Sequence, residues 1–176
     1  NQVKTEREAV DYIKEIATRQ KKKVMVNKGK EAVIVIKGKK SVRDGVRMVI
    51  SHVDSPRLDL KQIPLYQDSE SNLALFENNY YGVIKKFQWV VIPLAFHGVV
   101  VKKDGKKVTF TLGENENDPV FSVPDLLPHL SHEVQDGKKI DEAIKGEILD
   151  ITVGSMPIKG NFKEKIKTAI LDKLYE

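Results

Sequence analysis

The spacing of apolar and polar residues predicts that the chain begins with an amphipathic helix. Val10 and Ile13 start an apolar stripe with the three-to-four-residue period of a helix face. Thr5 and Glu8 have the spacing of a capping box, in which each side chain accepts a hydrogen bond from the other residue's backbone. These signals predict a helix over residues 6–19.

Short apolar runs after this helix predict three β-strands. Two of them, residues 23–27 and 31–37, are separated by a turn-like Lys-Gly-Lys sequence at 28–30. The third, residues 46–51, is apolar almost throughout, which predicts a strand buried in a sheet. Pro56 has no backbone N–H to donate to a sheet ladder, so the third strand should end near it.

The rest of the chain has a β-rich pattern. Residues 57–61 alternate polar and apolar, which predicts a strand with one solvated face. Residues 83–102 form a long β-rich stretch, and Asp104-Gly105 predicts a hairpin turn before a return strand at 108–112. Two further elements are predicted: a strand over 148–153, and a helix with a second capping box at 161–164 and an apolar stripe from Ile166 to Leu174.

Composition places the chain among water-soluble globular proteins. It has 176 residues, of which 40% are hydrophobic and 31% charged, enough for one domain or parts of two. No apolar run approaches the roughly 20 residues that span a bilayer, so no membrane partner is expected. Cysteine is absent, so a metal would have to use His, Asp or Glu. The simplest localisation is cytoplasmic.

The net charge of +5 comes largely from a lysine-rich segment between Arg19 and Arg47. Such a cluster can bind phosphate backbones. This segment has no aromatic residue on which a base could stack, and no nucleic-acid-binding motif accompanies it. We therefore favour a solvated surface and expect no nucleic-acid partner, with nucleic-acid binding as the least favoured function.

Candidate chemistry starts with His52 and Asp54, which stand two residues apart at the end of the predicted buried strand. Residues i and i+2 of an extended chain share a face, and ligand crevices of open α/β sheets lie at the carboxyl ends of strands. A histidine can bind a metal through one nitrogen while its other N–H is held by a carboxylate. The pair suits a metal centre, or a strand-end histidine whose hydrogen bonds are satisfied locally.

The other three histidines carry weaker signals. His97 lies in an apolar strand pattern and is interpreted as a satisfied structural histidine. His132 lies in a polar segment and is interpreted in the same way. His129 follows Pro124 and Pro128 in an apolar neighbourhood, which suits a rigidly positioned donor and equally a buried structural histidine.

Residues 51–59, Ser-His-Val-Asp-Ser-Pro-Arg-Leu-Asp, resemble the signature of the aspartyl aminopeptidase family of metallopeptidases. Three further segments match that family in the family's order: residues 79–89, 113–121 and 125–130. The resemblance spans roughly residues 42 to 160. It implies an enzyme that removes amino-terminal residues from peptides with two divalent metals, usually zinc.

The resemblance also implies roles for three residues. His52 matches the first metal ligand, and Asp54 matches the catalytic-site carboxylate that orients it. His129 matches a histidine of an inserted domain, which contacts substrate in a neighbouring subunit's active site. The remaining metal ligands and the general base have no match here, so we expect the front portion of such an enzyme, inactive by itself.

The fold class implied is α/β: a partial zinc-peptidase-like α/β/α domain over residues 1–56, followed by an inserted β-rich dimerisation domain over residues 57–176. A homo-oligomer, either a dimer or a larger assembly of dimers, should follow. A competing hypothesis from another class is a non-catalytic dimerisation or assembly module that pairs through the strands and aromatics of residues 80–112.

Overall fold

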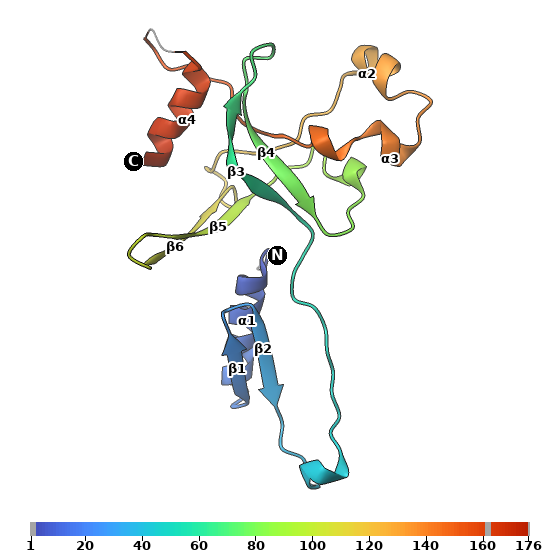
Figure 1. Ribbon diagram of the computed structural model, residues 1–176, viewed down its shortest axis with the longest axis vertical. Helices are drawn as coiled ribbons and strands as arrows, with labels where there is room; N and C mark the ends of the chain where they lie inside the picture. The colour runs from blue at the N-terminus through green and yellow to red at the C-terminus, as the bar shows by residue number, and fades with distance from the viewer. Residues whose placement is uncertain (1–2, 161–162, 176) are drawn as a thin grey trace. The chain divides into compact units, whose positions relative to one another are not determined.

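The computed structural model describes residues 3–160 and 163–175, with side chains as far as residue 170. The chain folds as two compact units, Asn1–Ser55 and Pro56–Glu176 (Figure 1). The elements of each unit are set by local sequence signals and by the apolar side chains that each unit buries.

The first unit begins with α1 (Glu6–Arg19), the helix predicted over the same residues. The predicted capping box is confirmed: Glu8 N–H donates to Thr5 Oγ1, and Thr5 N–H donates to the Glu8 carboxylate at 2.9 Å. Val10 and Ala17 are almost fully buried where α1 packs on the hairpin that follows. The helix is therefore held by its cap and by its apolar stripe.

That hairpin consists of β1 (Lys23–Asn27) and β2 (Glu31–Val35), which pair antiparallel. The predicted turn is confirmed, with Lys28 and Gly29 in the left-handed region at φ of 52° and 70°. β2 ends two residues earlier than predicted because Val35 lies opposite Lys23, the first residue of β1, and no residue of β1 remains to pair beyond it.

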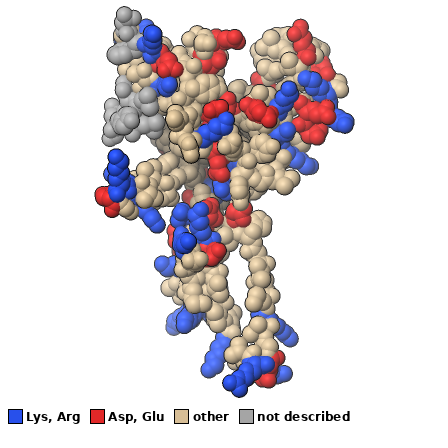
Figure 2. All heavy atoms as spheres, in the orientation of Figure 1, with Lys and Arg blue, Asp and Glu red and all other residues tan. Residues whose placement is uncertain are grey.

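Basic side chains are concentrated in this first unit. Residues 1–55 contain 14 Lys and Arg against 7 Asp and Glu, and Figure 2 shows many of them on its surface. Lys21, Lys22 and Lys23 are exposed, as a solvated surface requires. Lys30 is partnered by Glu6 at 3.1 Å.

The prediction of a buried strand over residues 46–51 is wrong for this chain. A short 3₁₀ helix, η1 (Val42–Asp44), precedes a segment that forms no strand. Its apolar side chains are exposed, Val49 at 98% and Ile50 at 81%. Apolar residues become a buried strand only when neighbouring strands pair with them, and no described residue is paired with this segment.

The second unit is built on a three-stranded antiparallel sheet in the order β3-β4-β7. Its strands are β3 (Arg57–Gln67), β4 (Ala74–Tyr81) and β7 (Ile151–Gly154). β3 extends beyond the predicted residues 57–61 and includes Pro64. The pairing register shifts between Leu60 and Leu65, which accommodates a proline that cannot donate to the ladder.

A separate hairpin consists of β5 (Phe96–Val101) and β6 (Lys107–Leu112). The predicted Asp-Gly turn is confirmed: Gly105 has φ of 83°, and the Asp104 carboxylate accepts the Lys106 N–H. The β-rich stretch predicted over 83–102 is interrupted by the 3₁₀ helix η2 (Lys86–Gln88). Ile84, Phe87 and Val90 are three residues apart and all pack at the core, which a helical turn allows and a strand does not.

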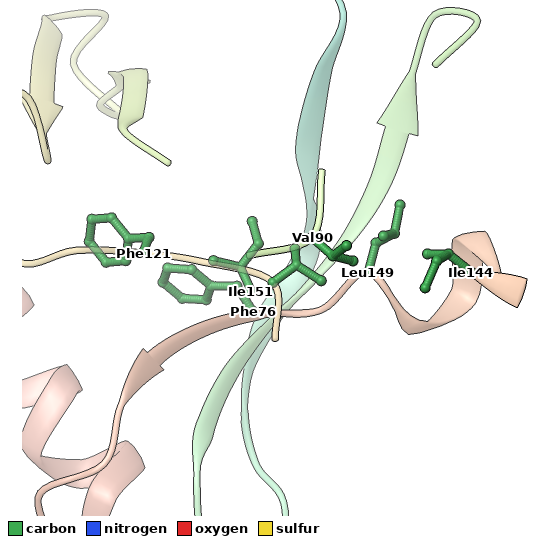
Figure 3. Close-up of a cluster of buried hydrophobic side chains, with 7 residues drawn as sticks. Phe76, Val90, Phe121, Ile144, Leu149 and Ile151 are labelled. Carbon is green, nitrogen blue, oxygen red and sulfur yellow. The ribbon is translucent and has the colours of Figure 1, made fainter. Parts of the chain in front are cut away.

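The buried cluster of this unit joins the sheet to its connecting segments, as Figure 3 shows. Its members are Phe76, Val90, Phe121, Val123, Ile144, Leu149 and Ile151. Aromatic contacts extend the cluster to the β5–β6 hairpin: the ring centroids of Phe76 and Phe96 lie 5.8 Å apart, and those of Phe96 and Phe110 lie 4.9 Å apart. The hairpin is thus attached to the core through one tilted and one edge-to-face ring contact.

Short helices complete the second unit: α2 (Pro128–Val134), α3 (Ile140–Ala143), η3 (Gly146–Ile148) and α4 (Lys165–Tyr175). The Gln67 Oε1 accepts the backbone N–H groups of Ile166 and Lys167 at the start of α4. Residues 161 and 162 of the predicted second capping box lie outside the described residues. Within the described parts of the chain, each helix is too short or too polar to cross a bilayer.

Gly98 is predicted to be essential for the packing of the β5–β6 hairpin. A Cβ added there would lie 2.2 Å from Cζ of Phe110. Gly98→Ala should therefore destabilise the second unit by about 1–3 kcal/mol, measured by urea unfolding followed through the fluorescence of Trp89.

The control for this prediction is the same substitution in a Phe110→Ala background, where the obstructing ring is gone. There, Gly98→Ala should cost less than about 0.5 kcal/mol. Equal costs in both backgrounds would show that the ring contact is not the cause.

Candidate metal centre

The side chain of His52 is held by Asp54 in an extended segment of the first unit. The imidazole Nδ1 lies 2.9 Å from the backbone oxygen of Asp54 and 3.2 Å from its carboxylate Oδ1. A carbonyl oxygen only accepts hydrogen bonds, so Nδ1 must carry the proton. The lone pair of the neutral ring is then on Nε2, the nitrogen that a metal would bind.

Neither side chain is enclosed. That of His52 is 81% exposed and that of Asp54 is 39% exposed. The geometry therefore orients the ring relative to Asp54 but supplies no cavity around it. The predicted proximity of His52 and Asp54 is confirmed, since the two side chains form a local hydrogen bond. The role of His52 in binding a metal stays a prediction.

The donor set does not make a complete zinc site. Among the described residues, no group of three or more His, Asp or Glu side chains is close enough to hold a metal ion. Catalytic zinc sites use three protein ligands and keep one position for water or substrate. His52 supplies one ligand, so we assign no reaction step to a metal held by this chain alone.

His129 lies in the first turn of α2, directly after Pro128 at the first helical positions. It is exposed, so the hypothesis that it is a buried structural histidine is wrong. It belongs to the second unit and His52 to the first. His132, on the same helix, is also exposed and pairs with the Asp136 carboxylate.

His97 is satisfied by a carboxylate, as its interpretation as a structural histidine requires. Its Nε2 lies 2.9 Å from Oε1 of Glu114, and its side chain is only 11% exposed. His97 lies on β5, whereas Glu114 follows β6. This contact therefore connects the hairpin to residues 113–119, the acidic loop that follows it.

That acidic loop is organised by the carboxylate of Asp118. Its Oδ2 accepts the backbone N–H groups of Gly113, Glu114 and Asn115 at 2.8, 3.0 and 3.1 Å. These bonds favour the ionised form and hold the pKa of Asp118 below its ordinary value of 3.8. This cap was not predicted from the sequence, although the turn-forming Gly, Asn and Asp residues were an available signal.

Loss of the Asp118 charge should loosen this loop. A folded-state pKa below the unfolded value contributes stability above pH 3.8, and this contribution is lost as the pH falls through the lower folded value. Asp118→Asn should lower the urea midpoint at pH 7. It should also reduce the difference between the midpoints at pH 7 and pH 3.

Glu116→Gln is the matched control in the same loop, because the Glu116 carboxylate makes none of these three bonds. It should leave both midpoints nearly unchanged. An Asp118→Asn variant with the pH dependence of the unmodified chain would contradict the capping role.

Comparison with known proteins finds close relatives. The family model described as "Aminopeptidase I zinc metalloprotease (M18)" matches residues 3–176. A "Probable M18 family aminopeptidase 1" from Clostridium acetobutylicum is 50% identical over 151 residues, covering 85% of this chain and 32% of the relative. A protein with the same description from Borreliella burgdorferi is 47% identical over 147 residues, covering 84% and 32%.

Solved structures agree with these relatives. The M18 aminopeptidase from Thermotoga maritima matches with a TM-score of 0.87 and 38% identity, over 98% of this chain and 40% of that one. Aminopeptidase I from Clostridium acetobutylicum matches with a TM-score of 0.80 and 42% identity, over 97% and 40%. The mixed α/β fold is thus confirmed, and the chain spans about a third of the length of the curated relatives it matches. The resemblance in the sequence is confirmed as well: this chain belongs to the M18 family of aminopeptidase I zinc metalloproteases.

Proposed function

We propose that this chain is the amino-terminal portion of a zinc aminopeptidase that releases amino-terminal residues from peptides. The observation that carries the proposal is the orientation of His52 by Asp54 in a chain of this family. In the proposal, His52 is the first metal ligand. Asp54 fixes the tautomer and raises the basicity of the imidazole, as carboxylates do behind metal-bound histidines.

The exposed apolar segment before His52 supports the same proposal. Met48, Val49 and Ile50 are 72%, 98% and 81% exposed, although residues of this kind are normally buried. We infer that residues 1–56 are part of a peptidase domain in which this segment pairs with further strands. The remaining metal ligands and the general base would come with those strands, so the chain alone should have no aminopeptidase activity.

Residues 57–176 would be the inserted dimerisation domain of a homo-oligomeric enzyme of the cytoplasm. The second unit has a buried cluster of its own. It also exposes Leu127, which caps α2, and Leu130 and Val134 on α2, at 61%, 57% and 45%. Such a stripe suits contact with another subunit, and His129 lies among these residues. We propose that His129 contacts the substrate bound to a neighbouring subunit.

The same exposed stripe is the observation that favours the second candidate function, a non-catalytic assembly module. The two candidates differ in their need for metal. The module would be favoured by two results together. The chain would assemble without zinc, and His52 would contribute nothing to the activity of a longer enzyme.

A chimeric enzyme tests the aminopeptidase proposal. Residues 1–176 would replace the matching segment of the Clostridium acetobutylicum relative, which is 50% identical. The chimera should release amino-terminal residues from peptides in the presence of zinc. His52→Ala should lower kcat/KM by at least about a hundredfold because a metal ligand is lost, and Asp54→Asn by about 10- to 100-fold.

His129 and His132 provide a matched pair on α2 of the same chimera. His129→Ala is expected to lower kcat/KM, whereas His132→Ala should stay close to the parent, because its partner is the local Asp136. A zinc-dependent chimera whose activity survives His52→Ala would refute the assignment of His52 as a ligand.

A further inference from the structure

The β5–β6 hairpin has an apolar face that continues from the core of the second unit toward the tip of the hairpin. Residues two apart on a strand, and residues directly opposite on the paired strand, share a face. The register places six residues on this face: Phe96, Gly98 and Val100, opposite Leu112, Phe110 and Val108. Phe96 and Leu112 pack against the buried cluster, whereas Val100 and Val108 are 51% and 37% exposed. The apolar face therefore starts in the core and ends in solvent.

Two lysines extend the same face at the tip of the hairpin. Lys102 and Lys106 are each two residues further along their strands than Val100 and Val108, and the Lys102 N–H donates to the Lys106 oxygen at 2.9 Å. Residues 96–112 contain four Lys, all exposed, against one Asp, and Figure 2 shows basic side chains at the tip. The hairpin thus presents an apolar pair with a basic border.

The exposed stripe of α2 has the complementary composition. Leu127, Leu130 and Val134 recur at helical spacing. Glu133 is also exposed, and it lies next to Leu130 on the helix surface because the two are three residues apart. Residues 125–147 together contain six Asp and Glu against three Lys. The second unit therefore carries both an apolar face with a basic border and an apolar stripe with an acidic border.

The two surfaces do not meet within one chain, because both are exposed in the structure. Figure 1 shows the hairpin and α2 at separate places in the second unit. A second copy of the chain offers each surface a matching partner. Val100 and Val108 would then lie against the stripe of α2, which removes apolar area on both sides from water. Lys102 and Lys106 would lie near the acidic border, where opposite charges attract.

Charge also distinguishes this pairing from the two symmetric ones. Two hairpins facing each other would bring Lys102 and Lys106 close to the same lysines of the other copy, and two α2 stripes would bring Glu133 close to Glu133. Like charges placed together at an interface are unfavourable. A contact between the hairpin and α2 avoids both repulsions. Because its two sides differ, it is a heterologous contact, which builds a ring or an open chain of copies.

We propose that the β5–β6 hairpin of one copy of this protein docks on α2 of another copy, with Val100 and Val108 against Leu130 and Val134. This inference rests on the proposed contact of α2 with another subunit and adds the surface that meets it. His129 lies about 100° from Leu130 around the helix, so it is outside the contact and keeps its proposed access to substrate.

Sedimentation velocity of the 176-residue chain tests this inference, at concentrations from about 1 µM to 1 mM that cover the affinities of small interfaces. The unmodified chain should associate, and added salt should weaken the association because opposite charges contribute to it. Val100→Asp should raise the dissociation constant at least about tenfold, since it places an unpaired charge in the contact. Val101→Asp is the matched control on the opposite face of β5 and should change it little.

Both valines are exposed, at 51% and 61%, so neither substitution should alter the fold. Equal urea midpoints of the two variants and the unmodified chain check this.

A mixture of two defective variants tests the heterologous character of the contact. Val100→Asp leaves α2 intact, and Leu130→Asp leaves the hairpin intact, so each variant alone should stay monomeric. An equimolar mixture should form a 1:1 complex through the one hairpin and the one α2 that remain functional.

Three results would overturn the inference: a monomeric unmodified chain, a Val100→Asp variant that associates as the unmodified chain does, or a mixture that forms no complex. In the second case, loss of association in Leu130→Asp would leave the proposed contact of α2 standing. These measurements need no peptidase activity, so the aminopeptidase proposal is tested separately by the chimeric enzyme.

Discussion

An extended apolar segment needs neighbouring strands, and this constraint governs the candidate site. Residues 46–51 have the apolar content of a buried strand, yet no described residue is paired with them. Burial of a single side chain such as Ile50 stabilises a fold by about 1.5–3 kcal/mol. The exposed side chains of this segment do not make that contribution here. His52 and Asp54 directly follow this segment. Their local hydrogen bond fixes the imidazole ring relative to Asp54, but the side chain of His52 stays exposed because the segment before it is unpaired.

The second unit shows the opposite situation, because its apolar residues have partners within the unit. The buried cluster around Val123 and Leu149 joins the three-stranded sheet to its connecting segments, and the Phe76–Phe96–Phe110 contacts attach the second hairpin. This packed framework supports the loop that Asp118 caps. The second unit is thus well packed by itself, whereas the side chain of His52 in the first unit remains exposed.

Local signals predicted much of the fold. Thr5 and Glu8 placed the first helix correctly, and Asp104-Gly105 placed the second hairpin, because caps and turns depend on neighbouring residues. Burial of residues 46–51 could not be predicted, since it depends on strands distant in sequence. Ile84, Phe87 and Val90 had the spacing of a helical turn, which the many β-branched residues around them obscured. The spacing of His52 and Asp54 predicted their pairing, whereas the cap at Asp118 had a weaker signal, the turn-forming Gly, Asn and Asp residues of its loop.

We propose that residues 46–51 form a strand only when the rest of a peptidase domain pairs with them and so completes the site around His52. Amide hydrogen exchange of these residues tests it most directly, measured in the 176-residue chain and in the chimera with the Clostridium acetobutylicum relative. We expect rapid exchange in the isolated chain and protection greater by on the order of a hundredfold in the chimera. Rapid exchange in a chimera that is folded and active would contradict it.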